Sequence, residues 1–144
     1  MPRPGEHLLL SSETREVIGA AMEVHRRLGP GYLESVYESA LAHELGLRGI
    51  QFVEQGRLEV RYKGMVVGDF KYDFLVEKSV IVELKAVRAL SDADDAQLQN
   101  YLRGTGIQVG LLINFGAPSL EWRRRVWTKI TRSESDQGES SKSA

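Results

Sequence analysis

Residues 80–87, VIVELKAV, constrain the fold more than any other stretch of the sequence. Six of these eight residues are apolar, which is typical of a strand buried inside a sheet. Glu83 and Lys85 nevertheless lie in it, one residue apart and therefore on the same face of the strand. A buried charge is costly unless it is paired or binds a metal. These two side chains therefore need partners from elsewhere in the chain.

Two helices are predicted before this strand. Ser11 or Ser12 is a candidate N-cap for the first helix, whose apolar residues recur at helical spacing from about residue 13 to residue 28. A Gly-Pro-Gly break at residues 29–31 ends it. A second apolar stripe then predicts a helix that ends near Gly46 or Gly49.

From residue 50 the apolar period changes to two, which predicts strands at residues 52–62, 65–76 and 80–87. Ser91 and Asp94 resemble a capping box, so a helix is expected from there to about Arg103. Residues 107–115 read as a central strand, and residues 125–130 as a short edge strand. Antiparallel neighbours followed by a helical crossover predict an α/β fold, a mixed β-sheet flanked by helices in the order α-α-β-β-β-α-β.

The composition is consistent with one domain at residues 11–131. Of the 144 residues, 42% are hydrophobic, which suffices for a single core. Residues 1–10 are expected to form a flexible arm, and the polar residues 132–144 a disordered tail. The net charge of −1 restricts nucleic-acid binding to a local patch, and the absence of cysteine excludes disulfides and cysteine-ligated zinc. No apolar run could span a bilayer, so a soluble, cytoplasmic protein is expected.

The position of Asp73 relative to Glu83 depends on the connection between two predicted strands. A three-residue connection at 77–79 places Asp73 opposite Glu83 and Lys71 opposite Lys85. A connection of two or four residues would instead place Asp73 opposite an apolar residue, and the sequence does not decide between them. Two interpretations follow: salt bridges such as Asp73–Lys85 on a solvated face, or two carboxylates that converge on a divalent cation beside Lys85.

Asp73 followed by Glu83-Leu84-Lys85 resembles the D…E-x-K core of the PD-(D/E)XK nuclease superfamily. Residues 31–37, GYLESVY, fit the G-x-x-E-x-x-Y signature of a bacterial and archaeal family within it. Residues 97–101, QLQNY, fit the Q-x-x-x-Y helix motif of its exonuclease-like branch. The resemblance extends from about residue 13 to residue 127 and implies a restriction-endonuclease-like fold. Tyr72 stands where the superfamily name has proline.

The resemblance implies a metal-dependent nuclease that hydrolyses phosphodiester bonds in nucleic acid, with DNA as the favoured substrate. Magnesium or manganese would be held by Asp73, Glu83, Glu34 and the Leu84 carbonyl. Lys85 would position or activate the attacking water. The implied catalytic residues are Glu34, Asp73, Glu83, Lys85, Gln97 and Tyr101.

Structural roles compete with several of these assignments. Glu34 would also suit a helix N-terminus, and Tyr37 would suit the core. Gln97 and Tyr101 could be packing side chains at the edge of the sheet. The basic run Arg123-Arg124-Arg125 fits a nucleic-acid backbone, a solvated face or a partner surface equally.

The main alternative is a non-cleaving module that keeps the nuclease fold and binds nucleic acid or protein. A homodimer, or a subunit that is active only within a larger complex, is also compatible with the sequence.

Overall fold

A computed structural model describes residues 10–128 of the chain. The predicted tail, residues 132–144, lies outside this range, as does the predicted arm at residues 1–10 except for its last residue. Three helices and seven strands occur in the described range: α1 (Ser11–Leu28), α2 (Glu34–Leu47), β1 (Phe52–Glu54), β2 (Arg57–Tyr62), β3 (Met65–Lys71), β4 (Phe74–Val76), β5 (Val80–Lys85), α3 (Asp92–Thr105), β6 (Val109–Asn114) and β7 (Glu121–Val126). No helix in this range is long and apolar enough to cross a membrane.

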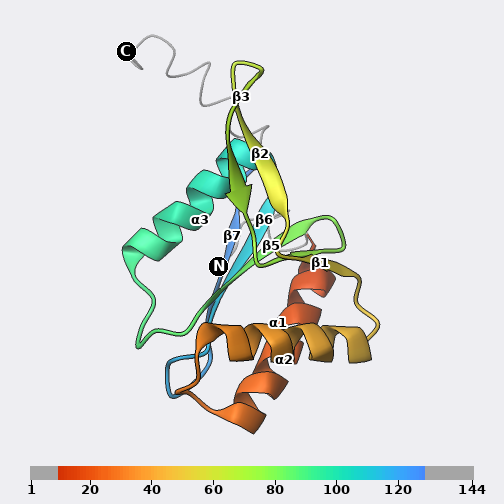
Figure 1. Ribbon diagram of the computed structural model, residues 1–144, viewed down its shortest axis with the longest axis vertical. Coiled ribbons are helices and arrows are strands. Elements are labelled where there is room, and N and C mark those ends of the chain that lie inside the picture. Colours follow the sequence, from red (N-terminus) through yellow and green to blue (C-terminus); the bar gives the residue numbers. More distant parts are fainter. Residues whose placement is uncertain (1–9, 129–144) are drawn as a thin grey trace.

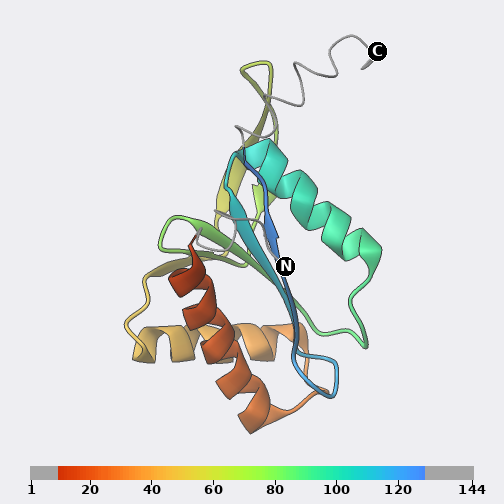
Figure 2. The ribbon, with the colours of Figure 1, turned by 180° about the vertical axis from the view of Figure 1, so that it is seen from behind.

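Five strands form a mixed sheet in the order β1-β4-β5-β6-β7. β5 and β6 are parallel and are joined by the crossover helix α3, whereas the other neighbours are antiparallel. Helices α1 and α2 cover one face, and α3 covers the other (Figures 1 and 2). The predicted α/β architecture is confirmed. The strand predicted at residues 80–87 is β5, which ends at Lys85 and is central in the sheet.

The two faces of the sheet have separate hydrophobic clusters. The first joins α1 and α2 to β4, β5 and β6, with Val82, Leu84 and Ile113 among its fully buried residues. The second joins α3 to the other face, where Ile81 contributes from β5. Glu83 and Lys85 alternate with the residues of the first cluster, so they lie on the face that α3 covers.

The strands predicted at residues 52–62 and 65–76 are each divided in two, and this corrects the predicted order. β2 and β3 form a separate two-stranded sheet, while β1 and β4 belong to the large one. Both breaks lie at the same level, where the Gln55 N–H donates to the Asp73 carbonyl (2.9 Å) and the Tyr72 N–H donates to the Gly56 carbonyl (3.0 Å). The Tyr72 ring covers Gly56 so closely that any Cβ at this glycine would collide with it.

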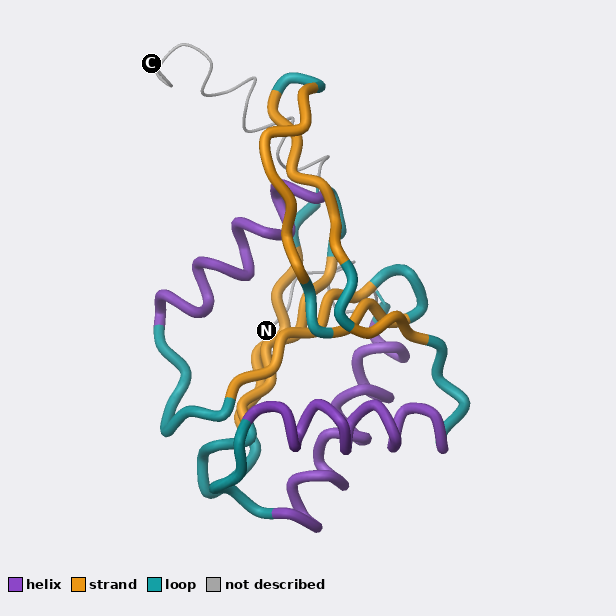
Figure 3. Tube along the Cα trace, in the orientation of Figure 1, coloured by secondary structure: helices purple, strands orange, loops and turns teal. Residues whose placement is uncertain are grey.

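This division removes a predicted cross-strand pair. Lys71 lies opposite Arg57 in the two-stranded sheet, so the predicted placement of Lys71 opposite Lys85 is wrong. The two-stranded sheet is a long hairpin that projects from one end of the molecule (Figure 3).

The ends of the elements differ from the predictions in a few places. α1 begins at Ser11 with Leu10 in the left-handed conformation as its N-cap, and no serine side chain caps it. The capping box of Ser91 and Asp94 is confirmed, but α3 continues past Gly104 to Thr105, because Gly106 takes the left-handed C-cap position. The edge strand β7 begins at residue 121, earlier than predicted, and pairs with β6 along its whole length.

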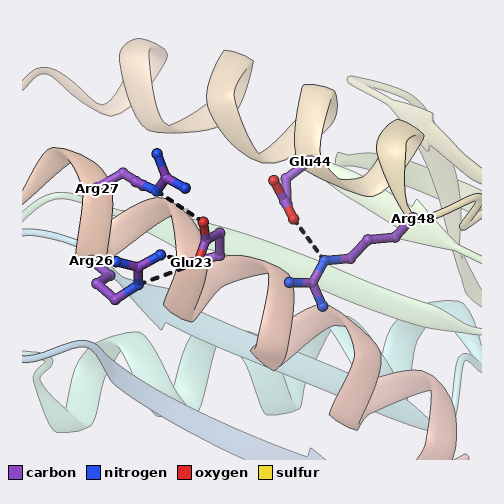
Figure 4. Close-up of polar contacts among 5 residues, drawn as sticks. All are labelled: Glu23, Arg26, Arg27, Glu44 and Arg48. Atoms are coloured by element: carbon purple, nitrogen blue, oxygen red, sulfur yellow. Dashed lines mark hydrogen bonds and ion pairs between the residues drawn. The ribbon is translucent and has the colours of Figure 1, made fainter.

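Salt bridges join charged side chains along the first two helices (Figure 4). On α1, Glu23 accepts from Arg26 at 2.8 Å and from Arg27 at 3.0 Å. On α2, Arg48 Nε lies 2.8 Å from Glu44 Oε2. Such exposed pairs one turn apart contribute roughly 0.3–0.5 kcal/mol each, so the stability of these helices comes mainly from their buried faces.

Candidate active site

Asp73 and Glu83 are adjacent across the β4–β5 hairpin. Val76 pairs with Val80 and Phe74 with Val82, so the three-residue connection is confirmed and Asp73 lies opposite Glu83. The backbone N–H of Asp73 donates to Glu83 Oε2 at 3.3 Å. In return, the backbone N–H of Leu84 donates to Asp73 Oδ2 at 2.8 Å. Each carboxylate is therefore positioned by the backbone of the other strand.

Both carboxyl groups are poorly placed to carry their charge alone. Burial, followed by the nearby charge of Asp73, raises the pKa of Glu83 to about 8. Burial also raises the pKa of Asp73, although the hydrogen bond from Leu84 opposes this shift. A cation between the two groups would stabilise their ionised forms, because it would offset both the desolvation and the repulsion.

Lys85 lies on the same face as Glu83, two residues farther along β5. Its Nζ is 3.8 Å from Asp94 Oδ1, so the described structure pairs it with Asp94 and not with Asp73. The sequence assigned Asp94 only to helix capping, whereas in the structure it both caps α3 and pairs with Lys85. The amine thereby remains at the face between β5 and α3.

Glu34 is the first residue of α2, close enough to Asp73 and Lys85 for their charges to affect its pKa. Partial burial and then the charge of Asp73 raise the pKa of its carboxyl group. The positive charge of Lys85 lowers this pKa, so Glu34 interacts electrostatically with both Asp73 and Lys85. The predicted association of Glu34 with the Asp73–Glu83 pair is therefore consistent with the structure.

Gln55 joins α2 to Asp73, and the sequence analysis missed it. Its side-chain amide donates to Glu38 Oε1 and Oε2 at 2.9 and 2.8 Å, and to Asp73 Oδ1 at 3.3 Å. Glu38 lies one helical turn after Glu34 and therefore on the same face of α2. A hydrogen bond with Glu38, and then partial burial, raise the pKa of Glu54 to about 7. No sequence motif marks Glu38, Glu54 or Gln55, because their proximity depends on the break between β1 and β2.

Gln97 and Tyr101 lie on α3, but no hydrogen bond or ion pair among residues 10–128 joins either to Asp73, Glu83 or Lys85. Gln97 is exposed. The Tyr101 ring stacks on Phe70 of β3, with their centroids 3.7 Å apart. Tyr101 therefore has a packing role, in that it fixes the base of the β2–β3 hairpin to α3.

Tyr37 of the G-x-x-E-x-x-Y signature is fully buried. Its hydroxyl donates to the Gly29 carbonyl at 2.5 Å and accepts from the Tyr32 N–H at 3.1 Å. Its ring stacks on Phe115 at 4.8 Å. The tyrosine therefore closes the loop that sets the start of α2, and through it the position of Glu34.

Two residues of the predicted basic patch contact α3. Arg123 donates to the Ser91 carbonyl at 3.4 Å. Arg125 Nε lies 2.6 Å from Asp95 Oδ1 as an ion pair without hydrogen-bond alignment. Arg124 alternates with these two along β7 and points to the opposite face. The patch is therefore divided between two faces, and two of its three arginines hold the N-terminus of α3.

The donor set fits a divalent cation through a pair of carboxylates. Oxygen ligands from Asp73 and Glu83 are those that magnesium and manganese prefer. Within the described residues, no group of three or more histidine or acidic side chains is arranged to hold a metal ion. A site here would therefore rest on the pair, completed by backbone or solvent oxygens.

A comparison with family models matches the PD-(D/E)XK nuclease superfamily to residues 11–125. Among solved structures, the crystal structure of SSO0001 is similar with a TM-score of 0.54 and 18% identity, over 93% of this chain and 69% of that one. An alkaline exonuclease, LHK-Exo from Laribacter hongkongensis, aligns with a TM-score of 0.44 and 14% identity, over 86% of this chain and 75% of that one. No curated protein sequence matches the chain. At this low sequence identity, the likeness to SSO0001 is a likeness of fold alone.

Proposed function

Because the chain belongs to the PD-(D/E)XK nuclease superfamily, we propose that it is a nuclease that hydrolyses phosphodiester bonds in DNA with magnesium or manganese. Nucleases of this superfamily are generally dependent on a divalent metal ion. The observation that carries the proposal is the pair of Asp73 and Glu83, linked by reciprocal hydrogen bonds, with Lys85 on the same face.

In this proposal Asp73, Glu83 and the Leu84 carbonyl would hold the cation, and Glu34 would complete the site through a water molecule. When bound, the cation would polarise the scissile phosphate and offset the negative charge that builds on it. Glu83 would then be held in its ionised form, because a neighbouring cation would offset the burial and the repulsion from Asp73 that raise its pKa.

Lys85 has the second role. Its ammonium group moves from Asp94 to the attacking water or to a phosphate oxygen, where it orients the nucleophile and stabilises developing charge. A pair at 3.8 Å with both side chains partly exposed is weak, so this exchange costs little. Gln97 lies on α3 three residues after Asp94, the partner of Lys85. We assign it a supporting contact to the phosphate.

We also propose that the chain belongs to the G-x-x-E-x-x-Y family of this superfamily. The support is that the three signature residues have three different structural roles. Gly31 has a φ of 114°, Glu34 lies near the carboxylate pair, and Tyr37 closes the loop before α2. The positive φ favours glycine, because other side chains rarely adopt that conformation.

The test is cleavage of linear duplex DNA and of single-stranded DNA by the purified protein in magnesium, in manganese and in EDTA. Lys85→Ala should lower the rate by at least about 100-fold, the scale that removal of a transition-state contact reaches. Lys78→Ala is the matched control, since it removes an exposed lysine from the β4–β5 connection. Cleavage that survives Lys85→Ala would contradict the assigned mechanism.

A non-cleaving binding module is the second candidate, and the absence of a three-ligand group among residues 10–128 favours it. Calorimetry with manganese distinguishes the two candidates. The nuclease requires saturable binding that Asp73→Asn abolishes, whereas the module requires none.

A further inference from the structure

The distal half of the β2–β3 hairpin exposes apolar side chains. Tyr62, Met65, Val66 and Val67 are between 45% and 67% exposed. They lie around the turn of the hairpin, farthest from the body of the molecule (Figures 1 and 3). Exposed apolar side chains grouped on a projecting element indicate a binding surface.

The base of the same hairpin is fixed. Phe70 is the buried residue of β3 and stacks on Tyr101, while Leu58 and Val60 pack into the cluster that α3 covers. Between Val60 and Arg61 the pairing shifts by one residue, as in a β-bulge, and such a shift bends the strand and changes the direction of the distal half of the hairpin. The hairpin is therefore an arm with a rigid base and a solvent-exposed end.

The charge of the arm is opposite to that of the chain. Residues 57–71 contain four basic residues (Arg57, Arg61, Lys63 and Lys71) and two acidic ones (Glu59 and Asp69), a balance of 4 − 2 = +2, whereas the chain as a whole has a net charge of −1. Asp69 pairs with Arg57 at 3.2 Å, and Glu59 pairs with Arg61 at 2.6 Å. Lys63 and Lys71 have no ion pair within the described residues and supply the excess charge.

The arm is also connected directly to the candidate site. β3 ends at Lys71, two residues before Asp73. Its seven residues span about 20 Å at ~3.3 Å per residue. Since base pairs stack about 3.4 Å apart, the arm is long enough to follow roughly six of them from the site.

We propose that the β2–β3 hairpin is a nucleic-acid-binding arm that lies along duplex DNA beside the site; this inference rests on the proposed nuclease function. A two-stranded ribbon fits the major groove. Lys63 and Lys71 contact phosphates, and Tyr62 and Met65 present apolar surface to the bases or sugars. A second copy of the chain is disfavoured as the occupant, because it would bring a second positively charged arm against the first.

The test is the fluorescence anisotropy of a labelled 30-base-pair DNA duplex and of one of its strands. EDTA is present throughout, so that binding is read without cleavage. Lys63→Ala should weaken duplex binding about 3- to 10-fold and reduce the slope of log affinity against log salt by about one, as expected for one lost phosphate contact. Arg15→Ala, an exposed arginine on α1, is the control and should change neither quantity. Met65→Ser should weaken binding with an unchanged salt slope.

Several outcomes would overturn the inference. An unchanged affinity and slope for Lys63→Ala would do so, as would wild-type protein that binds neither probe. A loss confined to the single strand would overturn the assignment to duplex DNA. Analytical ultracentrifugation adds another: a dimer that Met65→Ser dissociates, with DNA affinity unchanged, would identify the arm as a self-association surface.

The design separates this inference from the proposed function. Because EDTA is present in the binding assay, duplex binding is measured without cleavage. Normal duplex binding by a wild-type protein that cleaves no DNA in magnesium or manganese therefore contradicts only the nuclease. Normal cleavage together with unchanged binding by Lys63→Ala contradicts only the arm.

Discussion

Asp73 and Glu83 hold each other in place through backbone donors. The Asp73 N–H donates to Glu83 Oε2 at 3.3 Å, and the residue after Glu83 donates to Asp73 Oδ2 at 2.8 Å. Each carboxylate therefore has a backbone donor that fixes its position. A pair of acids fixed by adjacent segments of one sheet is pre-organised for a ligand that needs fixed oxygen donors.

Metal binding should raise the melting temperature. A ligand that binds only the folded state contributes about 2.7 kcal/mol at 100 times its Kd, which corresponds to several degrees. We expect manganese to raise the melting temperature of the wild type, and Asp73→Asn or Glu83→Gln to remove this increase. Asp69→Asn, an exposed carboxylate of the hairpin, is the control and should retain the full increase. An equal increase in all four proteins would place the metal elsewhere.

The raised pKa of Glu83 predicts how stability depends on pH without metal. In the folded protein Glu83 binds a proton up to about pH 8, whereas its ordinary pKa is 4.5. Between these values the folded state binds more protons than the unfolded state, so stability falls as the pH rises. This contribution is complete below about pH 4.5 and is lost as the pH rises through 8.

Thermal melts from pH 5.5 to 8.5 in EDTA measure this effect. Glu83→Gln should weaken the fall in melting temperature and should melt about 5 °C or more above the wild type at pH 8.5. Parallel curves for the two proteins would show that Glu83 is ionised in the fold.

Loss of the Gln55 side chain should disturb Asp73 without unfolding the protein. Its amide is the polar link between Glu38 and Asp73, and removing it leaves two acids without a shared donor. We expect Gln55→Ala to cost about 1 kcal/mol in urea unfolding and to weaken manganese binding about tenfold, a scale found for outer-shell partners of metal ligands. Gln51→Ala, an exposed glutamine on the other side of β1, should change neither measurement.

Tyr37 should matter for stability and not for chemistry. Tyr37→Phe keeps the stack on Phe115 but removes the bond to the Gly29 carbonyl, at a cost of about 1 kcal/mol. Tyr32→Phe is the control, because its ring is half exposed. We expect Tyr37→Phe to retain the wild-type cleavage rate below its melting temperature. A large loss of rate in a stable protein would instead indicate a catalytic role for Tyr37.

Local patterns were sufficient to predict the central part of the fold. The apolar run around Glu83 and the capping box at Ser91 each depend on neighbouring residues alone. The length of the connection at 77–79 was left open by the sequence, and the structure shows the register that places Asp73 opposite Glu83.

The remaining features depend on contacts between distant segments. The strand break at Gly56 arises because Tyr72, sixteen residues later, packs over it. That break brings Gln55 to Asp73, so neither the break nor the link has a sequence signature. Tyr101 matches a motif, and only the structure reveals its stack on Phe70.

The shared break at Gln55 and Asp73 also makes the hairpin modular. The two backbone hydrogen bonds between these segments close the large sheet before the hairpin begins. Residues can therefore be added or removed in pairs at the turn of the hairpin without displacing Asp73. A fold of this kind can vary its reach along a substrate by insertions and deletions at one loop while its chemistry stays constant.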